Sequence, residues 1–321
     1  MASTKVQVPT IDFSNPQLKQ GTTQWESTKT QVLEALQEFG CFEAIYNKVP
    51  NEIREAIFGT SKEIFEFPLE IKLKNFSNKP THGYQGMIPH LPLYESLCIA
   101  DLLKPQSVET FANIFWRDGN LDFCNLVKSY SNPLVTLDEM VKRMILESLG
   151  LNKYIDGFLD LNYFLFRFTH YKASNGDENK PGLGGHTDGN FLTIISQNQV
   201  NGLQILKKNG EWIDANISPN SYVVLSGDSF MAWTNGRLHS PVHRVTLAGE
   251  SDRFSIQLFS LPKPGHTIEA PKELVDEQHP LLFKSFEILG LLEYVKSAAG
   301  YGAGNDTFKA YCGVRDVAIH Y

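Results

Sequence analysis

Between residues 163 and 262 the chain is built from short, strongly β-prone runs. Turn-forming stretches such as KKNGE, SPNS and AGESD separate these runs. Many short strands at such spacing predict a β-sandwich or a small barrel. The runs are YFLFRFTHY, NFLTIISQ, GLQILK, EWIDA, SYVVLSG, HSPVHRVTL and RFSIQLFSLP.

Helical patterns flank this β region on both sides. Apolar residues recur at helical spacing between Trp25 and Gly40, over Asn51–Phe67, from about Asn132 to Leu149, and over residues 288–295. We therefore expect an N-terminal region of helices and short strands (1–115), connecting helices (116–160), a β core (161–263) and a helical tail (264–321).

Three further segments are expected to lack helix. VQVPTIDF, residues Val6–Phe13, contains a proline that suits the edge of a sheet, and CFEAIY, residues 41–46, follows the first helix as a strand. Residues Pro80–Pro105 are rich in proline, glycine and aromatic residues, so we expect a long ordered loop, a kind of segment that often carries function. Its side chains either line a binding pocket or seal one end of the β core. The glycine-rich GYGAG, residues 300–304, is expected to form a surface turn.

Composition and charge exclude several classes of partner. The 29 basic and 36 acidic residues give a net charge of −7, and the basic residues do not cluster, so nucleic acid is not expected as a partner. No window approaches the roughly 18 uninterrupted apolar residues of a membrane span. The four cysteines lie far apart without metal-binding spacing, which suits a reducing compartment. Because the N-terminus also lacks the profile of a secretory signal, we expect a cytoplasmic protein.

The sequence GGHTDGNFLTII, residues 184–195, places a histidine and an aspartate at the start of one β run. Residues i and i+2 of a strand face the same side, so His186 and Asp188 direct an imidazole and a carboxylate to a common point. Such a pair would hold either a proton or a metal ion, and a metal ion would need further ligands. Gly184 and Gly185 do not indicate a phosphate loop, because no helix and no GK[ST] follow them.

A third ligand would best come from another strand of the β core. Of the nine histidines, His239 and His243 lie in its later half, in LHSPVHRV. Pro241 between them excludes a zinc-binding helix of the HExxH kind. On a strand both histidines can face the same way, so spacing alone does not choose between them.

Arg253 and Ser255 indicate an anion site in the same region. Arg253 follows His243 by ten residues, and Ser255 shares its face of the run RFSIQLF. A guanidinium and a hydroxyl that point into a β core form a receptor for a carboxylate, and no acidic residue is an obvious partner. Two histidines and one carboxylate leave open metal positions, as in non-haem Fe(II) oxygenases. The arginine then implies a co-substrate with a distal carboxylate, which 2-oxoglutarate supplies.

Together these motifs resemble the signature of plant Fe(II)- and 2-oxoglutarate-dependent dioxygenases. They are HTD at 186–188, LHSPVHRV at 238–245 and RFS at 253–255. The likeness covers nearly the whole chain, since VPTIDFS resembles the N-terminal strand of that family and FGCFEAIY its helix-to-strand turn. PLYESL (92–97) and FKAYCGV (308–314) are most similar to the branch with glucosinolate side-chain dioxygenases, steroidal-alkaloid hydroxylases and auxin-oxidising dioxygenases.

The resemblance implies a mostly β core with α flanks, a double-stranded β-helix or jelly roll between an N-terminal helical region and a C-terminal helix. Many relatives carry an asparagine two residues before a tyrosine that contacts 2-oxoglutarate. Here that tyrosine is Tyr171 and the earlier position is Thr169, which leaves a co-substrate contact from Thr169 open. Tyr171 could also be no more than a packed aromatic side chain. Carried over by position, the iron ligands are His186, Asp188 and His243, and the 2-oxoglutarate contacts are Arg253, Ser255 and Tyr171.

The implied reaction oxidises a C–H bond while 2-oxoglutarate and O2 become succinate and CO2, with ascorbate as reductant. Halogenases of the family lack the carboxylate, so Asp188 favours hydroxylation, desaturation or ring closure. The aromatic loop and mildly acidic surface suggest a small, largely apolar plant metabolite or hormone as the substrate, bound by Met87, Tyr94 and Phe259. We further expect a monomer. Two alternatives are an ascorbate-using oxidase of the same fold and a non-catalytic barrel that binds a small acid.

Overall fold

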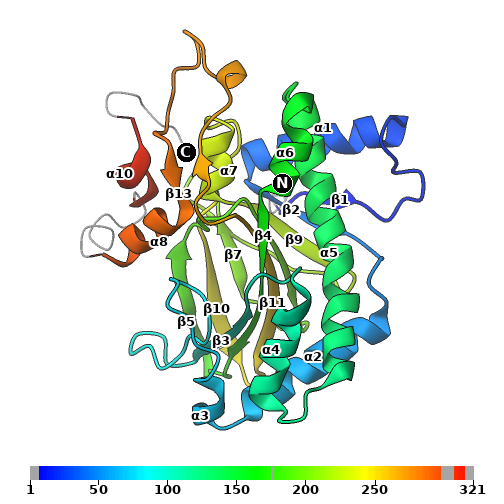
Figure 1. Ribbon diagram of the computed structural model, residues 1–321, viewed down its shortest axis with the longest axis vertical. Coiled ribbons are helices and arrows are strands. Elements are labelled where there is room, and N and C mark those ends of the chain that lie inside the picture. Colours follow the sequence, from blue (N-terminus) through cyan, green and yellow to red (C-terminus); the bar gives the residue numbers. More distant parts are fainter. Residues whose placement is uncertain (1–6, 175, 298–306, 315–321) are drawn as a thin grey trace, which may run out of the picture.

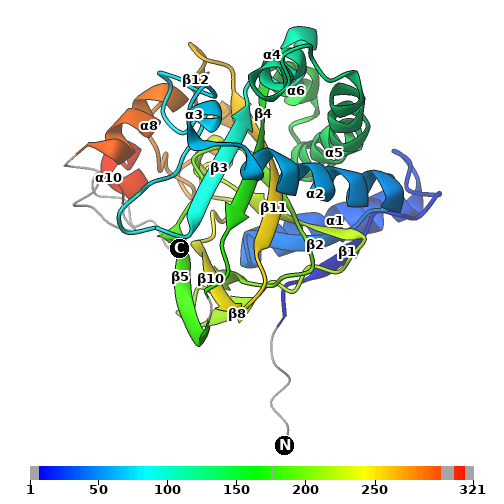
Figure 2. The same cartoon turned by 90° about the horizontal axis from the view of Figure 1, so that it is seen from below.

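The protein consists of two facing β-sheets with a layer of helices on the outer face of the larger sheet (Figures 1 and 2). The computed structural model describes residues 7–174, 176–297 and 307–314. Val6 and the GYGAG segment at 300–304 lie outside these ranges.

The larger sheet has seven strands, and all neighbouring pairs are antiparallel except β1 with β2. β1 lies at one edge, as Pro9 directly before it predicts. In spatial order the strands are β1 (Thr10–Asp12), β2 (Cys41–Ile45), β9 (Ser221–Ser226), β6 (Leu192–Gln197), β11 (Arg253–Pro262), β4 (Asn162–Tyr171) and β3 (Tyr94–Ile99).

The smaller sheet has four antiparallel strands and lies on the opposite side of the larger sheet from the helices (Figure 2). A separate two-stranded sheet, β12 (Thr267–Ile268) with β13 (Phe286–Glu287), lies in the tail. The order of the four strands is β5 (Gly176–His186), β10 (His243–Gly249), β7 (Leu203–Leu206) and β8 (Trp212–Asp214).

The helices α1, α2, α4 and α5 form the outer layer, and α8 and α10 pack together in the tail. Short 3₁₀ turns occur at Asn152–Tyr154 and Lys272–Leu274. The helices are α1 (Thr23–Glu38), α2 (Asn51–Glu66), α3 (Leu69–Lys72), α4 (Pro105–Phe115), α5 (Leu121–Ser148), α6 (Ile155–Asp160), α7 (Asp228–Trp233), α8 (Ile288–Lys296) and α10 (Thr307–Cys312).

Both faces of β4 are buried, which explains why its sequence contains so many aromatic residues. Phe166 packs against Tyr130 of α5, and Phe168 packs against Phe111 of α4. The alternate side chains of β4, among them Arg167, line a cavity between the two sheets. A sandwich of antiparallel sheets around a cavity confirms the predicted jelly roll with helical flanks.

Two predicted boundaries need correction. The helix expected from about Asn132 begins at Leu121, where the Asn120 side chain accepts a hydrogen bond from the Phe123 amide, and it continues through Pro133. The expected loop Pro80–Pro105 contains strand β3, which pairs with β4 along its full length. In both places tertiary packing outweighs the local effect of proline and glycine.

Strand β5 has no counterpart among the predicted runs. Its sequence, GDENKPGLGGH, lacks β-branched and aromatic residues. It forms by pairing with β10, through a ladder with three register irregularities. The pairing therefore depends on a partner that lies far away in the sequence.

In the parts of the chain described above, no helix is long and apolar enough to cross a bilayer. The four cysteines are buried free thiols at positions Cys41, Cys98, Cys124 and Cys312.

Lys142 and Asp138 form a buried ion pair that fixes the helix layer to the larger sheet. Lys142 Nζ lies 2.7 Å from Asp138 Oδ2, and their side chains are 0% and 1% exposed. The ammonium also donates to Asn162 Oδ1 of β4 at 2.6 Å, and Ser260 Oγ of β11 donates to Asp138 Oδ1 at 2.6 Å. The pair thus joins α5 to two central strands.

Replacing Lys142 by methionine should lower the free energy of unfolding by about 3–5 kcal/mol, because Asp138 would remain as a buried, unpaired charge. The double variant Lys142→Met/Asp138→Leu should lose less stability than this single variant. Urea denaturation measures both quantities. Equal losses in the single and double variants would contradict the role assigned to the pair.

Candidate active site

A cavity of about 570 Å³ lies between the two sheets. Side chains of β4, β6 and β11 form one wall, and residues of β5, β7 and β10 form the other. The tail also contributes, through residues of α8 and α10. None of the site residues predicted from the sequence lies in the helical tail, so its part in this cavity is an addition to the prediction. The tail residues are Leu291, Leu292, Val295, Thr307 and Phe308.

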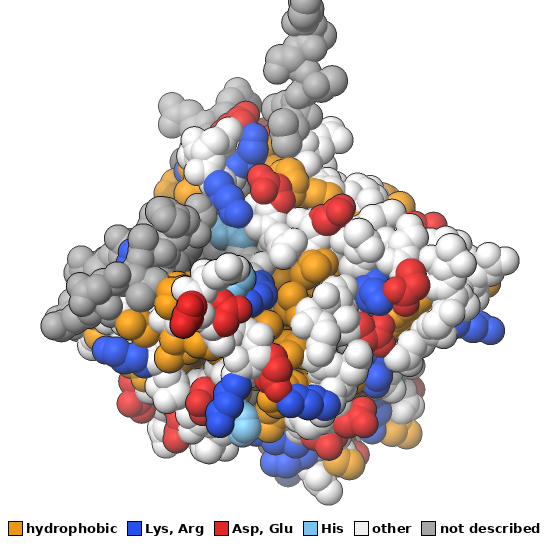
Figure 3. Space-filling view, turned by 90° about the horizontal axis from the view of Figure 1, so that it is seen from above, with side chains coloured by type: hydrophobic (Ala, Val, Ile, Leu, Met, Phe, Trp, Pro, Cys, Tyr) orange, Lys and Arg blue, Asp and Glu red, His pale blue; other side chains and the backbone are white. Residues whose placement is uncertain are grey.

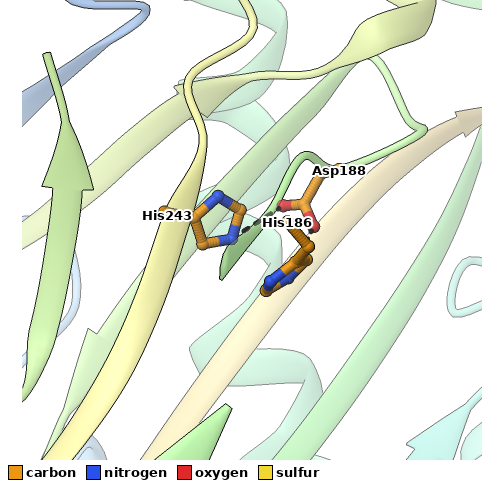
Figure 4. A group of neighbouring side chains, drawn as sticks. All are labelled: His186, Asp188 and His243. Carbon is orange, nitrogen blue, oxygen red and sulfur yellow. Dashed lines mark ion pairs between the residues drawn. The ribbon is translucent and has the colours of Figure 1, made fainter. Parts of the chain in front are cut away.

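His186, Asp188 and His243 converge at this cavity (Figure 4). His186 ends β5, His243 begins β10, and the two residues are direct partners in the ladder. His186 Nε2 lies 3.7 Å from Asp188 Oδ1, and His243 Nε2 lies 3.8 Å from Asp188 Oδ2. The three ligand atoms lie within 4.8 Å of one another, a spacing that suits a single metal ion.

The hydrogen bonds of the two imidazoles prepare them for metal binding. His186 Nδ1 lies 2.9 Å from the Gly184 carbonyl, and His243 Nδ1 lies 3.3 Å from the Pro241 carbonyl. Since a carbonyl only accepts, Nδ1 carries the proton in each ring and Nε2 keeps its lone pair. Burial and the neighbouring His186 lower the pKa of His243 to about 4, which favours the neutral ligand form.

This donor set fits Fe(II). Two neutral imidazoles and one carboxylate on one side of an ion leave positions open toward the cavity. Thr193 Oγ1 donates to Asp188 Oδ2 at 2.6 Å, which fixes the orientation of the carboxylate.

His239 does not belong to this group. It precedes strand β10, and its backbone N–H donates to the Leu36 carbonyl of α1 at 3.0 Å. A Cβ atom on Gly40, whose φ is +69°, would lie 2.6 Å from the His239 carbonyl oxygen, so only glycine fits this contact. Of the two histidines that spacing left open, the structure therefore brings His243 to the other two.

A turn that the sequence did not single out supports Asp188. The Asp228 amide donates to the Asp188 carbonyl at 2.7 Å, and Thr187 Oγ1 donates to Asp228 Oδ2 at 2.8 Å. A Cβ atom on Gly227 would lie 2.7 Å from the Asp188 carbonyl oxygen and closer still to that of Asn190. Burial raises the pKa of Asp228 to about 7. In the sequence, the motif SGD directly after an apolar run is the feature that could have indicated this turn.

Arg253 is a buried cation in the same cavity. It is 1% exposed and its Nη1 and Nη2 groups donate to Ser255 Oγ at 3.2 Å and to Gln197 Oε1 at 2.9 Å. Its Nε–H has no acceptor, and within the described residues it forms no ion pair. Burial lowers its pKa. A buried guanidinium with neutral partners alone is a receptor for an anion. Gln197 was not predicted, although it lies opposite Ser255 on β6.

Tyr171 and Thr169 lie on β4, the strand that pairs with β11. Tyr171 lies directly opposite Arg253, with its ring centroid 5.3 Å from the guanidinium carbon, and burial raises the pKa of its hydroxyl. Thr169 Oγ1 donates to Gln257 Oε1 at 2.9 Å. Since Gln257 in turn donates to Ser255 Oγ at 2.8 Å, Thr169 acts on the anion site through Gln257.

Two of the three predicted substrate contacts lie at the cavity. Tyr94 and Phe259 line it, and the Tyr94 hydroxyl donates to Ser96 Oγ at 2.9 Å. Met87 is 72% exposed, with a φ of +57°, and is not part of the cavity wall. Met87 therefore lies outside the cavity that Tyr94 and Phe259 line.

Comparisons with known proteins identify the family. The 2OG-Fe(II) oxygenase superfamily matches residues 155–262, and the family described as non-haem dioxygenase in morphine synthesis N-terminal matches residues 8–92. The chain is 43% identical over 304 residues to a probable 2-oxoglutarate-dependent dioxygenase of Arabidopsis thaliana, AOP1.2, covering 93% of this chain and 94% of that relative. The chain belongs to the 2-oxoglutarate- and Fe(II)-dependent dioxygenase family.

Solved structures of this dioxygenase family agree with the assignment. A dioxygenase for auxin oxidation from Arabidopsis thaliana, in complex with 2-oxoglutarate, matches with a TM-score of 0.78 and 28% identity over 85% of this chain and 100% of that chain. The corresponding rice enzyme matches with a TM-score of 0.80 and 28% identity over 96% of this chain and 100% of that chain. The predicted family is confirmed, and auxin-oxidising dioxygenases of the predicted branch are among its structural neighbours. The protein is thus a dioxygenase that uses Fe(II) and 2-oxoglutarate.

Removal of one carboxylate tests the metal centre. Changes in the groups that orient metal ligands typically weaken metal binding about 10–100-fold, so Asp188→Ala, which removes a ligand, should weaken Fe(II) binding by more than about a hundredfold. Iron content after anaerobic reconstitution and dialysis measures the loss. His239→Gln is the matched control, because His239 lies outside the cluster, and it should retain wild-type iron content. Iron retained in Asp188→Ala would show that the ion binds elsewhere.

Proposed function

We propose that this dioxygenase holds Fe(II) with His186, Asp188 and His243, binds the distal carboxylate of 2-oxoglutarate with Arg253, and hydroxylates a small, largely apolar molecule. The observation that carries the proposal is the buried Arg253, which has no carboxylate partner among the described residues and shares one cavity with the three ligand side chains. A dicarboxylate that reaches from the metal to the arginine satisfies both groups.

The residues around Arg253 give this co-substrate a fixed orientation. Ser255 and Gln197 hold the guanidinium in place, and the Tyr171 ring lies against it. A planar guanidinium binds a carboxylate through two parallel hydrogen bonds, which directs the 2-oxo acid end toward the metal ligands. When bound, Fe(II) supplies oxygen activation: one atom of O2 enters succinate, CO2 is released, and the other atom becomes the substrate hydroxyl.

The cavity walls favour an apolar substrate. Leu91, Leu165 and Leu292 are among the many aliphatic side chains that surround the cavity. These side chains also limit the water that reaches the reacting C–H bond. The Asp188 carboxylate would fill the ligand position that a halide needs, which favours hydroxylation, desaturation or ring closure over halogenation. Of these we propose hydroxylation, with ascorbate as reductant.

One face of the molecule agrees with a small-molecule substrate rather than a polymer. On the face in Figure 3, basic and acidic side chains are interspersed and the basic ones form no continuous stripe. A protein that binds nucleic acid would need such a stripe. We further propose that the enzyme acts as a monomer in the cytoplasm, where its buried free cysteines would stay reduced.

Arg253→Ala tests the 2-oxoglutarate site. Truncating a buried, hydrogen-bonded charge typically costs about 2–5 kcal/mol of binding, so the KM for 2-oxoglutarate should rise by at least about thirtyfold. Succinate release by iron-reconstituted protein, with a panel of small apolar plant metabolites, measures it. Arg143→Ala, at the surface of α5, removes an arginine outside the cavity and should leave the KM unchanged.

Two results would count against this proposal. An unchanged KM in Arg253→Ala would exclude this residue as the co-substrate site. No succinate from iron-loaded wild type, together with turnover supported by ascorbate alone, would indicate an oxidase of the same fold.

A further inference from the structure

The buried lysines and the buried arginines of the described residues differ in their partners. Among the described residues, the buried lysine and arginine side chains are Lys72, Lys142, Arg167 and Arg253, which are between 0% and 8% exposed. The two lysines lie outside the cavity, and each has a carboxylate oxygen at 2.7 Å. The two arginines line the cavity, and neither forms an ion pair within the described part of the chain. Arg253 is assigned to 2-oxoglutarate, so Arg167 remains without an anion.

The contacts of Arg167 hold the side chain in place but do not neutralise it. Nη1 donates to Ser96 Oγ at 2.7 Å, and Nη2 donates to the Thr81 carbonyl. Both acceptors are neutral, and a guanidinium has five N–H groups, so donors remain for a further acceptor. Burying a charge without a counter-charge is costly, which favours an anion that arrives with a ligand.

Arg167 and Arg253 lie at different positions on the same wall of the cavity. Strand β4 directs Arg167, Thr169 and Tyr171 into the cavity, and Tyr171 is the residue opposite Arg253. Arg167 lies four residues away along β4, roughly 13 Å between Cα atoms at the usual rise of a strand. Thr169 lies between the two positions on β4, and its side chain donates to Gln257, the residue opposite Arg167 on β11.

The surroundings of Arg167 place it on the metal side of the cavity. Its guanidinium carbon lies 5.9 Å from the centroid of the Phe259 ring. Phe259 pairs with Thr193 on the next strand, and Thr193 donates to the Asp188 carboxylate. An anion bound at Arg167 would therefore belong to a molecule whose other part reaches the reacting centre.

We infer that Arg167 binds a carboxylate of the substrate, and that the substrate class is small monocarboxylic acids with an apolar body. The inference rests on the proposed function, because the substrate is the molecule that this site oxidises. A carboxylate matches the planar guanidinium through two hydrogen bonds. The aliphatic side chains Leu91, Leu165 and Leu292 accept the apolar body.

Binding of acids and their esters tests this directly. The probes are phenylacetate, naphthylacetate and cinnamate, each beside its methyl ester, which keeps the apolar body and removes the charge. Calorimetric titrations use protein loaded with Mn(II) and saturated with 2-oxoglutarate, so that Arg253 is occupied. Hydrogen bonds to charged groups contribute about 1.5–3 kcal/mol, so at least one acid should bind about ten- to a hundredfold more tightly than its ester.

Substitutions of Arg167 assign this preference to the residue. In Arg167→Gln the acid and its ester should bind equally, whereas Arg167→Lys, which keeps the charge, should retain part of the preference. The Arg167→Lys variant also covers the case that Arg167→Gln fails to fold. If no acid binds better than its ester to wild type, or if the preference survives in Arg167→Gln, the inference is overturned.

A second readout separates this inference from the proposed function. Succinate released slowly from 2-oxoglutarate without any substrate depends on the metal and Arg253 but not on Arg167. It should therefore persist in Arg167→Gln. Loss of the acid preference with this basal release intact supports the role of Arg167, whereas absence of basal release in wild type would count against the proposed function itself.

Discussion

The pairing of His186 with His243 is the constraint on which the site depends. These residues are direct partners where β5 ends and β10 begins, so one antiparallel ladder sets the separation of the two imidazoles. Asp188 follows β5 by two residues and is fixed by Thr193 and by the turn at Gly227. Because the supporting contacts come from the backbone and from neighbouring strands, the ligands are positioned before a metal binds.

Charge burial provides the second organising principle. The chain neutralises Lys142 with Asp138 where α5 packs on the larger sheet. Within the cavity it leaves Arg253 and Arg167 with neutral partners. An unneutralised buried charge reduces the stability of the free protein. It also favours ligands that carry an anion over neutral ones, because the anion supplies the missing counter-charge. We propose that one cavity recognises two different acids in this way, 2-oxoglutarate at Arg253 and the substrate at Arg167.

Part of the site could be predicted from the sequence because Arg253 and Ser255 share one face of β11 and His243 begins β10, two strands with strong local patterns. The sequence also predicts the pair His186 and Asp188, but at the start of one strand, whereas in the structure His186 ends β5 and Asp188 lies in the connection to β6. Residues contributed by non-local pairing could not be predicted. Strand β5 is rich in glycine and depends on β10, and Gln197 reaches Arg253 only across the β6–β11 pair. The tail residues at the cavity depend on the packing of α8 and α10, for which helical periodicity gives no direction.

The central claim is that one cavity holds the metal centre and a receptor for the distal carboxylate of 2-oxoglutarate. Its most direct test is anaerobic calorimetry of the Fe(II)-loaded protein with 2-oxoglutarate and with 2-oxobutyrate, which has the same 2-oxo acid end but no distal carboxylate. We predict that wild type binds 2-oxoglutarate at least about thirtyfold more tightly, and that Arg253→Ala binds the two acids alike. Equal affinity of wild type for both acids would contradict the account.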